Sequence, residues 1–143
     1  MLVSTKGRYA LRVMTDLAEH PSEEYIPLKE IAQRQGISEK YLEAIIKILV
    51  RAKLLTGVRG KGGGYKLNRP PEQYTVGSIL RLTEDSLAPV SCLEQGAESC
   101  PRASECRSLP VWKGLAQVIN QYLDNITIAD LIRQCDAGND YVI

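Results

Sequence analysis

An amphipathic segment over residues 38–51 constrains the fold more than any other part of this sequence. Ser38 belongs to the residue types that cap helix N-termini, and Glu39 adds a negative charge in the first turn, where the helix dipole favours it. Six apolar residues follow with the spacing of one helix face: Tyr41, Leu42, Ile45, Ile46, Leu49 and Val50. The segment is therefore predicted to form a helix that begins after Ser38.

A shorter amphipathic segment precedes this helix, and a turn that contains glycine joins the two. Pro27 suits the first position of a helix, and Gly36 is the residue at which this helix is expected to end. Its apolar positions are Leu28, Ile31 and Ala32. Two helices joined in this way form a helix-turn-helix, whose second helix enters the major groove of DNA. Apolar spacing over residues 10–18 predicts one more helix upstream.

A basic, glycine-rich segment follows the second helix of this pair directly. Residues 54–58 and 65–67 have the composition of two short strands, and they enclose a run from Arg59 to Gly64. Glycine allows positive φ and a close approach to a duplex, while Arg59 and Lys61 can reach phosphates or a narrow minor groove. A basic hairpin behind a helix-turn-helix is a wing. The sequence thus predicts a mainly α-helical fold with a small β-hairpin, the winged helix-turn-helix.

The charge of the chain is unevenly distributed. Residues 1–75 carry thirteen lysines and arginines against eight acidic residues, whereas residues 76–143 carry five against nine. No acidic residue interrupts the stretch from Lys47 to Arg69, which is the most basic part of the chain. A local positive field attracts polyanions through counterion release even when the total charge is near zero.

Nine residues are candidates for contact with DNA. Glu43 can accept a hydrogen bond from cytosine N4, and Lys40 or Lys47 can reach guanine or phosphate oxygens. The alternative for each single residue is that it is an ordinary solvent-exposed surface residue without a role in DNA binding. The full set comprises Ser38, Lys40, Tyr41, Glu43 and Lys47 on the helix and Arg59, Gly60, Lys61 and Gly62 in the wing.

Three cysteines occupy a stretch without helical or strand periodicity, residues 85–109. Cys92, Cys100 and Cys106 have the spacing C-x7-C-x5-C, and three soft thiolates on one loop can bind an iron-sulfur cluster, zinc or Cu(I). The spacing does not choose among these, and a structural zinc site or three unrelated free thiols are alternatives. The fourth cysteine, Cys135, is interpreted as a small buried hydrophobe.

The remainder of the chain predicts three more helices. Thr75 can cap a helix that follows it, and Thr127 with Asp130 has the pattern of a capping box for a short last helix. Between them a long helix from Pro110 carries a broad apolar face: Val111, Trp112, Leu115, Val118, Ile119, Tyr122 and Leu123. We expect this face to pack against a second copy of the chain, with packing on the same chain as the alternative.

These patterns divide the chain into three parts: a winged helix-turn-helix DNA-binding domain (1–84), a cysteine-containing cluster-binding loop (85–109), and a dimerisation helix with the C-terminal tail (110–143). The first residues lack the pattern of a secretory signal and no long apolar run occurs, so a cytoplasmic protein without membrane contact is expected. The only histidine, His20, has no neighbouring nucleophile and is assigned to the surface. No catalytic arrangement is recognisable, and the chain is predicted not to be an enzyme.

The assembled motifs resemble the bacterial winged-helix regulators typified by IscR, NsrR and CymR. The resemblance is carried by residues 4–10, 36–38 with 41–43, 58–60 with 62–65, and 123–127. It implies a homodimer that binds a pseudo-palindromic double-stranded operator. It also implies that the loop cysteines hold an iron-sulfur cluster whose state changes DNA affinity, that Glu43 contributes to base selectivity, and that Arg59 enters the minor groove.

Within this family, the segment Lys6-Gly7-Arg8-Tyr9 resembles the IscR and CymR types rather than NsrR, and the three cysteines favour IscR. The implied function is a transcriptional regulator, mainly a repressor, of iron-sulfur cluster assembly or sulfur metabolism genes. Two alternatives from the same family are a cluster-free, CymR-like repressor of cysteine metabolism controlled by a cysteine-biosynthesis enzyme, and an NsrR-like nitric oxide sensor. A thiol-redox or zinc-stapled interaction module without gene regulation is an alternative from another class.

One position departs from the pattern of the cluster-binding members. Those with a 2Fe-2S cluster place a histidine three residues after the third cysteine, where this chain has Leu109. The fourth ligand is therefore open between Glu105, Ser108, a small molecule, and a 4Fe-4S cluster with one iron not ligated by the protein.

Overall fold

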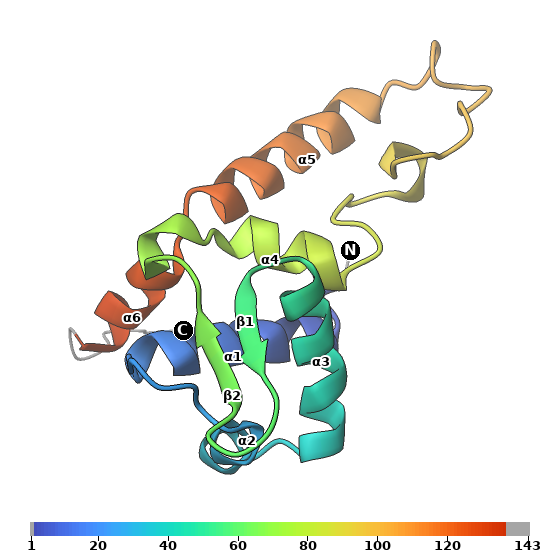
Figure 1. The fold of residues 1–143 in the computed structure, drawn as a ribbon. Helices are drawn as coiled ribbons and strands as arrows, with labels where there is room; N and C mark the ends of the chain where they lie inside the picture. Colours follow the sequence, from blue (N-terminus) through green and yellow to red (C-terminus); the bar gives the residue numbers. More distant parts are fainter. Residues whose placement is uncertain (1, 137–143) are drawn as a thin grey trace.

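Residues 2–136 are described by the computed structural model, with only the backbone described at Cys135 and Asp136. The expected role of Cys135 and the tail 137–143 therefore lie outside the described residues. In chain order the helices and strands are α1 (Thr5–Glu19), α2 (Leu28–Gln35), α3 (Glu39–Arg51), β1 (Leu55–Val58), β2 (Gly64–Leu67), α4 (Val76–Thr83), α5 (Leu109–Asp124) and α6 (Ile128–Asp136), with 3-10 turns at Pro71–Gln73 and Ser91–Leu93. Figure 1 shows this arrangement, which confirms the predicted helical fold with one small hairpin.

Helix α1 lies at the centre of the core, and α2, α3, α4 and α6 all contact it. Its residues Ala10, Val13 and Met14 are completely buried. From α3 the buried side chains are Leu42, Ile45, Ile46 and Leu49. These are positions of the apolar stripe in the sequence, and burying them fixes α3 with its polar face outward.

Three predicted helix starts are confirmed by their capping hydrogen bonds. The Ser38 hydroxyl accepts from the backbone N–H of Tyr41 at 3.2 Å, and the Thr75 hydroxyl accepts from the N–H of Ser78 at 3.1 Å. At the last helix, the Thr127 N–H donates to the Asp130 carboxylate at 2.9 Å while the Asp130 N–H donates to the Thr127 hydroxyl at 3.1 Å. These interactions are local in sequence, which is why the sequence predicts them well.

The start of α2 differs from the prediction. Pro27 precedes the first turn with an extended backbone (ψ 144°), and the helix begins at Leu28. The reason is the residue before it: Ile26 forms an antiparallel bridge with Tyr65 of β2, with backbone hydrogen bonds of 2.9 and 2.8 Å. The chain is thus still extended and paired with β2 through this single bridge when it reaches Pro27, so the helix cannot begin there.

The hairpin is pinned at its base by a buried tyrosine. Strands β1 and β2 pair antiparallel from Leu55 opposite Leu67 to Val58 opposite Gly64. The Tyr74 hydroxyl donates to the Leu54 carbonyl at 2.8 Å and accepts from the backbone N–H of Arg69 at 3.0 Å. One side chain therefore ties the entry and the exit of the hairpin together.

Helix α5 extends away from the core as an arm, with the cysteine loop at its far end (Figure 1). It is held at its C-terminal end, where the Arg81 guanidinium of α4 binds the Asp124 carboxylate at 2.6 Å. This hydrogen bond lowers the pKa of Asp124 below its ordinary value. Gly77 allows the close approach, because a Cβ there would lie 2.1 Å from an Asp124 oxygen. The arm begins at Leu109, one residue before the predicted Pro110.

Candidate DNA-binding surface and cysteine loop

The polar face of α3 presents the predicted helix residues to solvent. Ser38, Lys40, Tyr41, Glu43 and Lys47 are all exposed. Glu43 and Lys47 form an ion pair of 3.4 Å, with more than half of each side chain exposed. An exposed pair of this kind is weak, so Glu43 can exchange its partner for a donor on a base, and Lys47 can exchange its partner for a base or a phosphate.

The loop between β1 and β2 has the predicted wing geometry. Gly60 and Gly62 adopt positive φ angles of 95° and 77°, and the Gly63 N–H donates to the Gly60 carbonyl at 2.9 Å. Arg59 and Lys61 are exposed on either side of Gly60. Figure 1 places this loop at the same end of the molecule as the start of α3.

A groove separates α3 from the hairpin, and basic side chains line it. Lys47 and Arg51 come from α3, and Arg59 comes from the wing. Gly57 faces the groove beside the Tyr65 ring, where a Cβ would lie 2.8 Å from a ring carbon. Arg51 is not among the nine candidates of the sequence analysis. Its position four residues after Lys47, on the same helix face, is the signal that identifies it.

A buried carboxylate of α1 holds the C-terminal end of α2, just before the turn of the helix-turn-helix. Asp16 of α1 is 1% exposed, and it accepts hydrogen bonds from the Arg34 guanidinium at 2.7 and 3.0 Å and from the Gln35 amide at 2.8 Å. The hydrogen bond with Asp16 is the main cause that raises the pKa of Arg34 above its ordinary value, and Glu30 adds to it. The sequence analysis did not identify this network, although an acidic residue next to the buried positions of α1 was a visible signal.

The cysteine loop is open. Cys92 and Cys100 are exposed and Cys106 is half-buried. Among the side chains that the structure describes, residues 2–134, no three cysteine, histidine or acidic groups are gathered closely enough to hold a metal ion. The structure therefore does not bring the predicted cysteine ligands together. Between the 3-10 turn at Ser91–Leu93 and α5, the loop contains no further helix or strand that would fix the spacing of the three thiols.

Cys106 stands just before α5 in a polar environment. Its sulfur lies 3.4 Å from the Ser108 hydroxyl, and this hydrogen bond lowers the pKa of the Cys106 thiol, with smaller contributions from the backbone at Ser108 and Leu109. Thiolates are the ligands that soft metal centres prefer, and the lowered pKa of Cys106 favours its thiolate form. The three thiols therefore have the right donor chemistry for a soft metal centre. The Leu109 side chain offers no donor atom for a fourth ligand.

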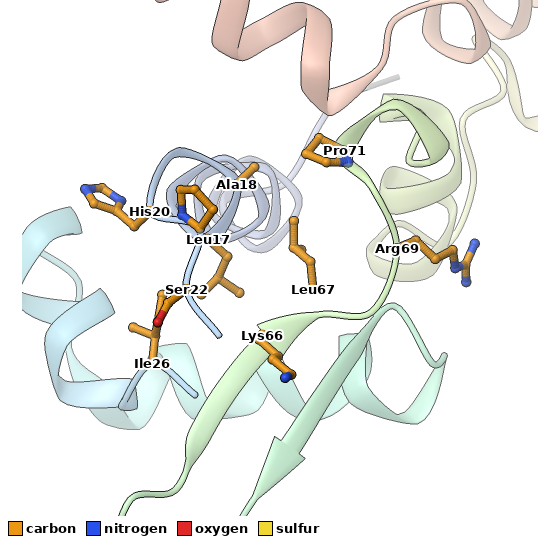
Figure 2. A pocket seen from close by; sticks show the side chains of 10 residues that line it. Leu17, Ala18, His20, Ser22, Ile26, Lys66, Leu67, Arg69 and Pro71 are labelled. Atoms are coloured by element: carbon orange, nitrogen blue, oxygen red, sulfur yellow. The ribbon is translucent and has the colours of Figure 1, made fainter. Parts of the chain in front are cut away.

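A small cavity lies between the end of α1 and strand β2, and its lining is largely apolar. Figure 2 shows that His20 and Arg69, which border it, point away from its centre. The His20 ring instead lies 2.8 Å from the Asp16 carbonyl oxygen at the end of α1. His20 and Arg69 therefore do not direct their side chains into the cavity.

Among the described residues, no helix is both long and apolar enough to cross a membrane.

The helix-turn-helix with a basic hairpin behind it defines the class of winged-helix DNA-binding proteins. The model of one family, Rrf2, described as "Iron-dependent Transcriptional regulator", matches residues 3–134. This chain belongs to the Rrf2 family of transcriptional regulators, and its relatives named IscR and CymR are regulators rather than enzymes.

Among the relatives, the HTH-type transcriptional regulator IscR of Sodalis glossinidius is 39% identical over 132 residues, which cover 92% of this chain and 79% of that protein. Two solved structures have the same fold. IscR of T. potens is 37% identical, with a TM-score of 0.73 over 99% of this chain and 94% of its own. CymR, the global cysteine regulator of B. subtilis, is 34% identical, with a TM-score of 0.74 over 93% of this chain and 97% of its own.

Proposed function

We propose that this regulator is a cytoplasmic DNA-binding repressor whose operator affinity is set by an iron-sulfur cluster on Cys92, Cys100 and Cys106. The observation that supports this proposal most is that three accessible thiols lie on one loop that leads into α5. When bound, the cluster supplies a centre that responds to iron supply and redox state. Either a 2Fe-2S or a 4Fe-4S cluster is compatible with three cysteines, and Glu105, Ser108 or a small molecule is the candidate fourth ligand. The regulated genes would be those of iron-sulfur assembly or sulfur metabolism.

The winged helix supplies operator recognition in this proposal. Helix α3 enters the major groove, where Glu43 accepts from a cytosine and Lys40 or Lys47 reaches guanine or phosphate oxygens. Arg59 enters the minor groove, and Lys61 neutralises phosphate. Ser38 and Tyr41 contact the sugar-phosphate backbone of the DNA near the start of α3. Gly60 and Gly62 give the wing the backbone freedom for a close approach.

The proposed repressor is a homodimer that pairs through α5. Four apolar side chains of α5 form a continuous exposed stripe: Val111, Leu115, Val118 and Tyr122. On the opposite side of the helix, Asn120 and Asp124 bind Arg81 of α4. An apolar stripe of this length on an exposed helix favours a second copy as its partner. Two recognition helices related by a two-fold axis then require a pseudo-palindromic operator.

Replacing Arg59 by alanine is expected to cost about 1–3 kcal/mol of operator affinity and to relax selectivity at the bases beside the wing. Lys61→Ala is the matched control one residue past the wing glycine. It should weaken binding to all sequences alike and reduce the salt dependence. Fluorescence anisotropy at several salt concentrations measures both effects. Unchanged affinity in both variants would show that the wing is wrongly assigned.

The cluster is tested by anaerobic purification and reconstitution. The wild-type chain should show the visible absorbance of an iron-sulfur cluster with bound iron and sulfide, and Cys92→Ala, Cys100→Ala and Cys106→Ala should each reduce it strongly. Leu109→His adds a histidine nitrogen as a possible fourth ligand, three residues after Cys106, where the leucine side chain has no donor atom. Absence of iron and sulfide from the reconstituted wild-type chain contradicts the cluster assignment.

A cluster-free regulator controlled by a protein partner is the second candidate. Leu109 provides no ligand, the three thiols are apart, and CymR, the global cysteine regulator of B. subtilis, is structurally similar. In this case the partner would be a cysteine-biosynthesis enzyme. Tight operator binding that is independent of all three cysteines would favour this candidate over the first.

A further inference from the structure

Four side chains form a strap across the turn between α2 and α3. On the α2 side, the Arg12 guanidinium of α1 donates to the Gln35 side-chain oxygen at 3.0 Å and also to the Gln35 backbone carbonyl. The same guanidinium lies over the Tyr9 ring, 5.1 Å from its centroid. On the α3 side, the Tyr9 and Tyr41 rings meet nearly perpendicular, with centroids 5.6 Å apart. The strap thus begins before the turn and ends in the first turn of the recognition helix.

The strap holds the turn mainly by polar and aromatic contacts, and of these residues Tyr9 is partly buried and also packs against the core. Arg12 is exposed, and Tyr41 is 42% exposed. Cation–π and aromatic pairs at exposed sites add little to folding stability. The helices α1 and α3 are already joined beneath the strap by completely buried residues such as Val13 and Leu42. The main effect of the strap is therefore on orientation.

The oriented group is the Tyr41 side chain. An exposed tyrosine on a helix normally exchanges between rotamers, because few neighbours restrict χ1. Here the Tyr9 ring stands against one side of the Tyr41 ring. Tyr9 is itself held by the Arg12 guanidinium on its face, and Arg12 is tied to the end of α2. Rotation at Tyr41 is therefore restricted by a support that is itself fixed.

We propose that Tyr9 is a positioning residue for operator binding, which acts by fixing the Tyr41 side chain at the start of α3. This inference rests on the proposed DNA-binding function, with double-stranded DNA as the ligand. In this role Tyr9 itself does not contact DNA. It reduces the conformational freedom that Tyr41 loses on binding, and a side chain that is already ordered binds more tightly.

A double-mutant cycle on operator affinity tests the proposal. Tyr9→Leu removes the ring, Tyr9→Phe keeps it, and Tyr41→Leu removes the oriented side chain. Tyr9→Leu is expected to weaken operator binding by about two- to tenfold, and Tyr9→Phe by less than about twofold. In the Tyr41→Leu background, Tyr9→Leu should have no further effect, because the group that it orients is gone. All affinities are measured well below the melting temperature of each variant.

The free protein gives a second readout that does not depend on DNA. Side-chain NMR couplings of Tyr41 should report one dominant rotamer in the wild type and in Tyr9→Phe, and rotamer averaging in Tyr9→Leu. An unaveraged Tyr41 in Tyr9→Leu, or additive losses in the cycle, would overturn the positioning role. A large loss in Tyr9→Phe would also overturn it, because it would indicate direct contact through the hydroxyl. A fixed Tyr41 in a wild-type chain that binds no DNA would instead refute the proposed function, and operator positioning with it.

Discussion

Replacing Asp16 by alanine is expected to lower the free energy of unfolding by about 3–5 kcal/mol, a large part of the stability of a domain this size. The reason is that Asp16 is fully enclosed and is the shared acceptor for Arg34 and Gln35. Without the carboxylate, the Arg34 guanidinium keeps its charge but loses its buried partner, and Glu30 remains as an exposed one. Removing the enclosed carboxylate leaves the Arg34 and Gln35 donors that faced it without an acceptor, which costs more than the hydrogen bonds themselves contribute.

The same substitution should also disturb DNA binding, because Asp16 fixes the C-terminal end of α2 and hence the turn before α3. Urea unfolding followed by circular dichroism measures the stability. Glu30→Ala is the matched control: it removes the other carboxylate that binds Arg34, at 2.6 Å, but this carboxylate is 53% exposed. Its loss is expected to cost only about 0–1 kcal/mol. Equal losses in the two variants would contradict the role assigned to the buried carboxylate.

A charge in the apolar stripe of α5 is expected to separate the proposed dimer and to reduce affinity for a full operator by about 10²–10⁴-fold. Val118 lies in the middle of the stripe and is 60% exposed in the single chain. In the proposed dimer the Val118→Glu carboxylate would be buried against its own copy, where an unpaired charge is strongly unfavourable. A monomer then binds half-sites singly and loses the benefit of linkage.

Analytical ultracentrifugation and binding to full and half operators measure this effect together. Gln117→Glu introduces the same charge on the polar side of the same helix, and it should leave both the dimer and the affinity intact. Half-site affinity should be similar in Val118→Glu and wild type, because the winged helix is not altered. A Val118→Glu chain that sediments as a dimer would contradict the pairing through α5.

The parts of the fold that the sequence predicts well depend on contacts between near neighbours. The Ser38 cap, the Thr127–Asp130 capping box and the two strands of the wing follow from residue types within a few positions of each other. The predicted start of α2 is wrong by one residue, because the bridge between Ile26 and Tyr65 joins segments that are far apart in the chain. A local rule for proline cannot take account of such a bridge.

The candidate site shows the same limit. The basic wing and the outward face of α3 follow from periodicity, but the support beneath them, through Asp16 and Tyr9, depends on which side chains α1 brings against α2 and α3. Cysteine spacing likewise identifies donor atoms without fixing their geometry. The three thiols of the loop are on one segment, and the structure leaves them apart.

In the proposed function, the state of the cysteine loop changes operator affinity. The most direct test of this coupling compares one anaerobic preparation of the wild-type chain before and after removal of the cluster, at a fixed salt concentration, on the same operator. The dissociation constant is expected to change by about 5–150-fold, the usual range of coupling between two sites. A chain with all three loop cysteines replaced by alanine should show no change under the same treatment. Equal wild-type affinity in the two states would contradict the claim.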